Sequence, residues 1–79
     1  MDIKEEILLW AKNRTTPFYS SDVFVGIDSV ESIQQVSSAL RSLFLSGSLM
    51  RKSEKKHFMY ALPHYAGSYF VTTKWRGNR

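Results

Sequence analysis

Apolar residues recur with a helical period between residues 30 and 44. Most are three or four positions apart, so a helix would place them on one buried stripe. The stripe consists of Val30, Ile33, Val36, Leu40, Leu43 and Phe44. Ser32 and Gln35 have the spacing of a capping box, and with Ser29 as an alternative cap they predict a ragged start near Val30. Gly47 is typical of the left-handed residue after a helix, so we expect a helix over about residues 30–46.

Apolar residues with the same helical period also occur at the start of the chain. A first stripe consists of Ile3, Ile7, Trp10 and Ala11, with Leu8 at its edge. Asp2 is a candidate N-cap, and the helix should end near Arg14. Pro17 disfavours helical geometry at the residue before it, which supports a break there.

Short elements are expected between these two helices. Phe18-Tyr19 predicts a short strand. Ser20 or Ser21 should cap a brief helix from Asp22 to about Val25, which would bury Val23 and Phe24. The segment 26–29 then forms the turn into the longer helix.

Two strand-like runs follow Gly47, over residues 49–52 and 57–62, with the polar segment 53–56 between them. This arrangement predicts an antiparallel hairpin. Alternation places Phe58, Tyr60 and Leu62 on one face, which should cover the core together with Leu49. Residues 69–73 have strong strand propensity, and residues 74–79 have the basic composition of a frayed end.

Composition narrows the class of protein. A chain of 79 residues holds one domain, and with no cysteine it has neither a disulfide framework nor a thiolate metal site. It has no apolar run near the roughly 18 residues that span a bilayer, and its start lacks the pattern of a signal peptide. We therefore expect a protein of the cytoplasm that does not engage membranes.

Charge is distributed unevenly along the chain. Residues 1–40 hold three basic and six acidic side chains, a net −3, whereas residues 41–79 hold eight basic and one acidic, a net +7. A half-chain this basic is typical of proteins that bind a polyanion. The same charge would also keep a small protein in solution, so the charge alone leaves both interpretations open.

The sequence shows none of the residue patterns of an enzyme. His57 and His64 have no companions at metal-ligand spacing. The chain has no Ser-His-Asp arrangement, no paired carboxylates and no glycine-rich phosphate loop. We expect no catalytic activity, cofactor, metal or small-molecule substrate.

The order of these elements resembles the winged helix-turn-helix domain. The likeness covers about residues 3–62 and is carried by Ile7-Leu8, Ser21-Asp22-Val23, Val36–Leu43, Gly47–Arg51 and Tyr60-Ala61-Leu62. In that family, the pattern V-x-x-x-L-x-x-L, then glycine, leucine and a basic residue, marks the recognition helix and the first wing strand. The resemblance implies an α+β fold over residues 1–63, with three helices and a two- or three-stranded antiparallel wing. Residues 64–79 would be an aromatic and basic extension.

The resemblance also implies binding to double-stranded DNA, with the third helix in the major groove and the wing on the backbone. The candidate base contacts are Gln34, Gln35, Ser38 and Arg41, and the candidate phosphate contacts are Ser32, Arg51, Lys52, Lys55 and Lys56. Glutamine matches the edge of adenine, arginine matches guanine, and lysines bind phosphates without reading sequence. A serine- and glutamine-rich helix face is, however, more often plain solvent surface, and Glu31 lies near its start. Affinity would then depend on the wing and the tail.

The sequence is compatible with more than one partner and more than one cellular role for this protein. Leu9 and Leu45 fall outside the buried stripes, so a homodimer through Leu9, Leu45 or the aromatic tail is one hypothesis, with half-sites about one DNA turn apart. The size resembles that of a small prokaryotic or phage regulator of transcription, acting at the nucleoid. The alternatives are a phage recombination or replication accessory factor, and a winged-helix module that binds only proteins.

Overall fold

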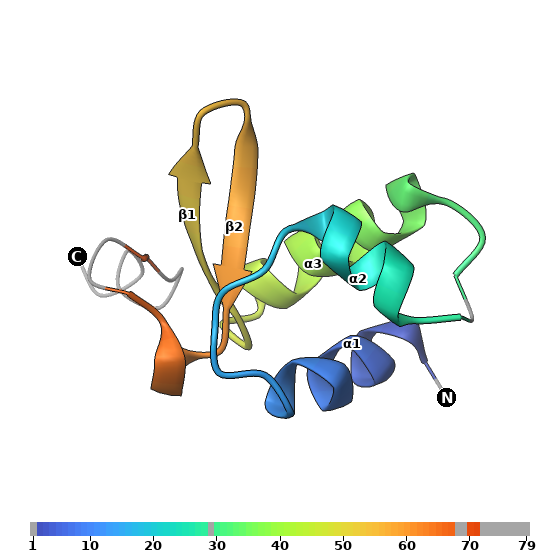
Figure 1. Cartoon of the computed structure of the whole chain (residues 1–79), viewed down its shortest axis with the longest axis horizontal. Coiled ribbons are helices and arrows are strands. Elements are labelled where there is room, and N and C mark those ends of the chain that lie inside the picture. Colours follow the sequence, from blue (N-terminus) through green and yellow to red (C-terminus); the bar gives the residue numbers. More distant parts are fainter. Residues whose placement is uncertain (1, 29, 68–69, 72–79) are drawn as a thin grey trace.

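The computed structural model describes residues 2–28, 30–67 and 70–71, and over these residues the chain forms three helices followed by one hairpin (Figure 1). The elements are α1 Ile3–Lys12, α2 Ser20–Gly26, α3 Ile33–Leu45, β1 Met50–Glu54, β2 His57–Ala61 and the 3₁₀ turn η1 Pro63–Tyr65. The three helices pack together, and the hairpin projects away from them (Figure 1). This small α+β fold confirms the predicted fold class.

The core lies where the three helices meet the base of the hairpin. Its largest fully buried side chains are Phe18, Ile7, Leu40, Leu49, Val23 and Val36. Most of the stripe predicted for α3 is buried, but Ile33 is 42% exposed and Val30 is only half-buried. The helix begins at Ile33 rather than near Val30, so these two residues lie at the edge of the core. The predicted start was therefore three residues too early.

Both ends of α3 are closed by side-chain and backbone hydrogen bonds. The Gln35 backbone N–H donates to Ser32 Oγ at 3.2 Å, which makes Ser32 the cap; Ser29 lies outside the described residues. Gln35 Oε1 accepts from the Glu31 N–H at 2.9 Å, one residue before the bond of a standard capping box. At the other end, Gly47 has a φ of 86°, as predicted for a residue that ends a helix in the left-handed conformation.

The two shorter helices differ in detail from the prediction. Asp2 occupies the N-cap position of α1, although its side chain makes no capping hydrogen bond, and the helix ends at Lys12, two residues before Arg14. The prediction that Ser20 or Ser21 caps α2 was wrong. The cap is Tyr19, whose N–H donates to the Asp22 carboxylate at 2.9 Å. Phe24 was predicted to be buried but is 38% exposed, and Val23 is the buried residue of α2.

The hairpin is tighter than expected. β1 and β2 pair from Met50 opposite Ala61 to Glu54 opposite His57, so the loop is Lys55-Lys56 alone and not the segment 53–56. Lys55 adopts a φ of 57° in this loop. Phe58 was expected to cover the core, yet it is 43% exposed; it pairs with Ser53, next to the last pair before the hairpin turn.

Two isolated bridges extend this sheet on both sides. Phe18 exchanges backbone hydrogen bonds of 2.9 and 2.8 Å with Tyr60, which confirms extended structure at Phe18. Arg51 exchanges bonds of 3.0 and 2.9 Å with Val71 on the outer side of β1. Phe70 is buried, so part of the predicted C-terminal extension packs onto the domain. The rest of the predicted strand over residues 69–73, and residues 74–79, lie outside the described residues.

Candidate nucleic-acid interface

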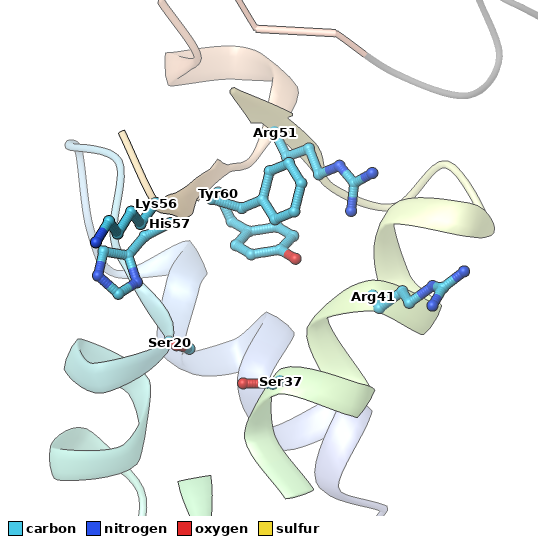
Figure 2. Close-up of a pocket in the computed structure, with 8 residues that line it drawn as sticks. Ser20, Ser37, Arg41, Arg51, Lys56, His57 and Tyr60 are labelled. Atoms are coloured by element: carbon cyan, nitrogen blue, oxygen red, sulfur yellow. The ribbon is translucent and has the colours of Figure 1, made fainter. Parts of the chain in front are cut away.

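An open groove of about 490 Å³ separates the hairpin from α3 and the start of α2. Its lining consists of Ser20, Ser37, Arg41, Arg51, Lys56, His57, Phe58 and Tyr60. Ser37 and Arg41 lie on α3, whereas Arg51 and Tyr60 come from the hairpin that faces it (Figure 2). Three of these side chains are cationic, and no carboxylate is among the described residues that line the groove. The groove therefore attracts anions.

The Arg51 guanidinium lies against two aromatic rings. Its guanidinium carbon lies 4.0 Å from the centroid of the Phe44 ring and 3.9 Å from that of Phe58. Two aromatic faces attract the planar cation and restrict its rotation. Such stacking uses the faces of the guanidinium and leaves its N–H edges for acceptors in the plane. Arg51 is thus preorganised to donate a pair of hydrogen bonds to a phosphate or a base edge.

α3 contributes Ser37 and Arg41 to the opposite wall of the groove. Gln34, Ser38 and Arg41 follow one another at helical spacing and are all exposed. Ser37 lines the groove and lies four residues before Arg41. The prediction of site residues omitted Ser37, although its spacing from Gln34 and Arg41 is that of one helix face. Of these residues Ser37 and Arg41 line the groove, whereas the predicted base contacts Gln34 and Ser38 are exposed on α3 outside its lining.

Two predicted contacts belong to the cap of α3. Ser32 Oγ accepts a hydrogen bond from the Gln35 backbone, and Gln35 Oε1 accepts one from the Glu31 backbone. A paired contact with adenine uses both the oxygen and the nitrogen of a glutamine amide. Such a contact by Gln35 would compete with the bond to Glu31. Gln34 has no such role in the cap, so it could make a paired contact with adenine without the loss of a capping bond.

The basic residues of the hairpin do not share one face. Side chains alternate along a strand, so Lys52 lies on the face opposite to that of Arg51. Lys52 Nζ is 3.1 Å from Glu54 Oε2 and 5.8 Å from the centroid of the Phe70 ring. Lys55 is exposed at the turn, while Lys56 lines the groove. Arg41, Arg51 and Lys56 therefore line the same groove, with Lys56 on the side away from the two arginines, whereas Lys52 lies outside it (Figure 2).

Several groove residues were absent from the predicted site. His57 and Phe58 were considered only as a metal ligand and a core residue, respectively, yet both line the groove. The His57 ring packs against the edge of Tyr19, with 6.4 Å between centroids. Strand alternation was the available signal for Phe58 and Tyr60, because it places them with Arg51 on one face.

Other site types find no support in the described part of the chain. Among those residues, no helix is long and apolar enough to cross a membrane, and no group of three His, Asp or Glu side chains could hold a metal ion. Comparisons with protein-family models, with curated proteins and with solved structures found no match to this chain.

Proposed function

We propose that this protein binds duplex DNA as a winged helix-turn-helix regulator of transcription. In this proposal α3 enters the major groove, and the hairpin lies along the backbone. The observation that carries the proposal is the groove itself: Arg41 on α3, Arg51 on β1 and Lys56 in the hairpin turn line one open space that has no carboxylate in its described lining. The exposed face of α3 also carries Gln34 and Ser38, polar side chains of the kind that read bases, outside the lining of the groove.

The residues take different roles in this complex. Arg51 and Lys56 bind phosphates on the strand that passes between α3 and the hairpin, and they fix the position of the protein. Gln34, Ser38 and Arg41 face the base edges, where glutamine pairs with adenine and arginine with guanine. Because α3 itself contributes little charge, most of the electrostatic affinity comes from the hairpin. Replacement of Lys56 should therefore weaken binding to all sequences alike.

A matched pair of lysine variants tests this assignment. Lys56→Gln and Lys52→Gln remove the same charge, but only Lys56 lines the groove, and Lys52 is already paired with Glu54. Binding to a random-sequence duplex is measured as a function of salt concentration. Lys56→Gln should reduce the slope of log K against log salt by about 0.9, the value for one phosphate contact. Lys52→Gln should leave the slope near that of the wild type.

Two outcomes would contradict the proposal. Absence of duplex binding at low salt would exclude DNA as the ligand, and equal slopes for the two variants would exclude the groove as its site. Selection of bound duplexes from a random pool then determines the sequence preference. A recombination or replication accessory factor would also enrich a DNA motif, so the location of that motif in the genome separates these roles.

A second candidate function is a protein-interaction module. The exposed apolar side chains support it: Val25 is 81% exposed, Leu45 57% and Leu9 48%. Docking through such residues resists salt, whereas DNA binding weakens steeply as salt rises. Retention of a partner protein at high salt, without any duplex binding at low salt, would favour this alternative.

A further inference from the structure

A second groove, of about 580 Å³, lies along α1 on the surface between this helix and the segment after the hairpin. Its lining consists of Glu5, Leu8, Leu9, Lys12, Ser48, Leu62 and His64. It shares no lining residue with the groove between α3 and the hairpin. In Figure 1, α1 lies on the side of the molecule away from the hairpin tip. A partner at α1 would therefore leave the proposed DNA-binding groove open.

The α1 side of this groove has opposite charges at its two ends. Glu5, Leu8, Leu9 and Lys12 recur at helical spacing and form one stripe. Leu8 and Leu9 occupy its centre, and Leu9 is 48% exposed. Glu5 and Lys12 are seven residues apart, which is about two helical turns or roughly 10 Å. The face is thus apolar in the middle, negative at one end and positive at the other.

We propose that this face binds a second copy of the same chain, with the two α1 helices antiparallel. A two-fold axis near Leu8 and Leu9 places Glu5 opposite Lys12 of the partner subunit, and Lys12 opposite the partner's Glu5. The leucines of both copies then meet at the axis. A parallel arrangement would instead oppose like charges at both ends. Charge complementarity therefore selects both the occupant and its orientation.

The size of the face sets the strength of the dimer. A helix of ten residues is about 15 Å long, so a pair of them buries less than the roughly 1,200 Å² of a stable interface. The free protein should dimerise only at high micromolar concentration or above. Adjacent half-sites on DNA would raise the local concentration to the millimolar range, a consequence that rests on the proposed function.

Cysteine cross-linking tests the contact without DNA. The chain contains no cysteine, so Leu9→Cys introduces a single thiol close to the proposed axis. Under mild oxidation at high micromolar concentration, Leu9→Cys should form a disulfide dimer at least about tenfold faster than Val25→Cys, because a disulfide needs the two Cα atoms within about 7 Å. Val25 is exposed on α2, outside the groove, and reports random collision. Equal rates, or faster cross-linking of Leu45→Cys, would overturn the proposal.

Charge reversal tests the orientation. Glu5→Lys and Lys12→Glu should each weaken self-association about tenfold in sedimentation equilibrium, because each creates two repulsive contacts per dimer. The double variant should recover wild-type association, since it restores both pairs with their signs exchanged. Lys4→Glu reverses a charge on α1 outside the groove lining and should have little effect. A double variant no better than the single ones would overturn the antiparallel arrangement.

Neither assay contains DNA, so its failure does not depend on the proposed function. A dimer that forms through α1 without duplex binding would support this inference and contradict the function. If the protein binds duplex DNA but Leu9→Cys cross-links no faster than Val25→Cys, the proposed function is supported and the α1 dimer is contradicted. Circular dichroism of each variant confirms that α1 remains helical.

Discussion

Replacement of Arg51 by lysine separates the charge of this residue from its shape. Lysine keeps the positive charge but lacks the planar cation that lies between the rings of Phe44 and Phe58. If the stack presents Arg51 to a phosphate, DNA affinity should fall although the net charge is unchanged. A protein that needed only charge at this position would bind DNA equally well with lysine.

The magnitude follows from the two ring contacts and the paired hydrogen bonds. A cation on an aromatic face contributes about 0.5–1 kcal/mol at an exposed site, and Arg51 is half-buried with two such faces. Loss of the fixed geometry should weaken DNA binding by about 1–2 kcal/mol, a factor of roughly 5 to 30. Loss of about 1 kcal/mol from the fold should lower the Tm by about 4–8 °C.

Fluorescence anisotropy over a range of salt concentrations is the appropriate assay. Arg51→Lys should lower the affinity at every salt concentration and leave the salt slope unchanged, whereas Arg51→Gln should also reduce the slope by about 0.9. Arg41→Lys serves as the control for stability, because the exposed Arg41 lies across the same groove and has no aromatic contact in the described part of the chain. Wild-type affinity and Tm for Arg51→Lys would refute the role of the stack.

Substitutions at three further positions test the packing of the domain outside the groove, and thermal unfolding measures each of them. In Gly26→Ala, the added Cβ would collide with the Trp10 indole, so stability should fall by about 1–3 kcal/mol; an unchanged Tm would refute this close approach. Gly47→Ala must adopt the left-handed φ of 86° and should cost about 1–2 kcal/mol, whereas Gly47→Asn should cost less. The Tyr65 hydroxyl donates to the Ala11 carbonyl at 3.0 Å, so Tyr65→Phe should cost about 1 kcal/mol. Burial raises the pKa of Tyr65 above its ordinary 10.0, because the folded state favours the neutral phenol. The stability that Tyr65 contributes to the fold is therefore complete below pH 10 and is lost as the pH rises through the folded pKa. Tyr65→Phe should abolish this loss of stability at high pH.

The sequence was most informative where one periodic signal determined the structure. The apolar period located α1 and α3, and the alternating runs after Gly47 located the hairpin. Boundaries were less accurate, because competing caps have similar local energies. Ser20 and Ser21 were both reasonable caps for α2, but Asp22 instead accepts the Tyr19 N–H and starts the helix earlier. Such choices depend on a single hydrogen bond, which composition does not reveal.

The candidate site was harder to predict because it depends on which face each side chain occupies. Arg51 and Lys52 are neighbours in sequence and were both expected to bind phosphate, but the strand directs them to opposite faces. Alternation from Leu49 places Arg51 on the face of Phe58 and Tyr60 and Lys52 on the other face, yet it does not show that the first face forms a groove with α3. The groove depends on the contact of Arg51 with Phe44, a contact between elements that no local pattern contains.

The aromatic stack also determines how the two walls of the groove respond to a ligand. Phe44 belongs to the last turn of α3, Arg51 to β1 and Phe58 to β2, so one set of contacts joins three elements. Residues 46–49 connect α3 to β1, and the stack adds a second contact between this helix and the hairpin. Binding of a ligand at Arg51 requires little further ordering of the groove walls, so its entropic cost is small. Side chains in the exposed Lys55-Lys56 loop, in contrast, must become ordered on binding. Arg51 should therefore contribute more affinity than either lysine of the loop, although all three carry the same charge.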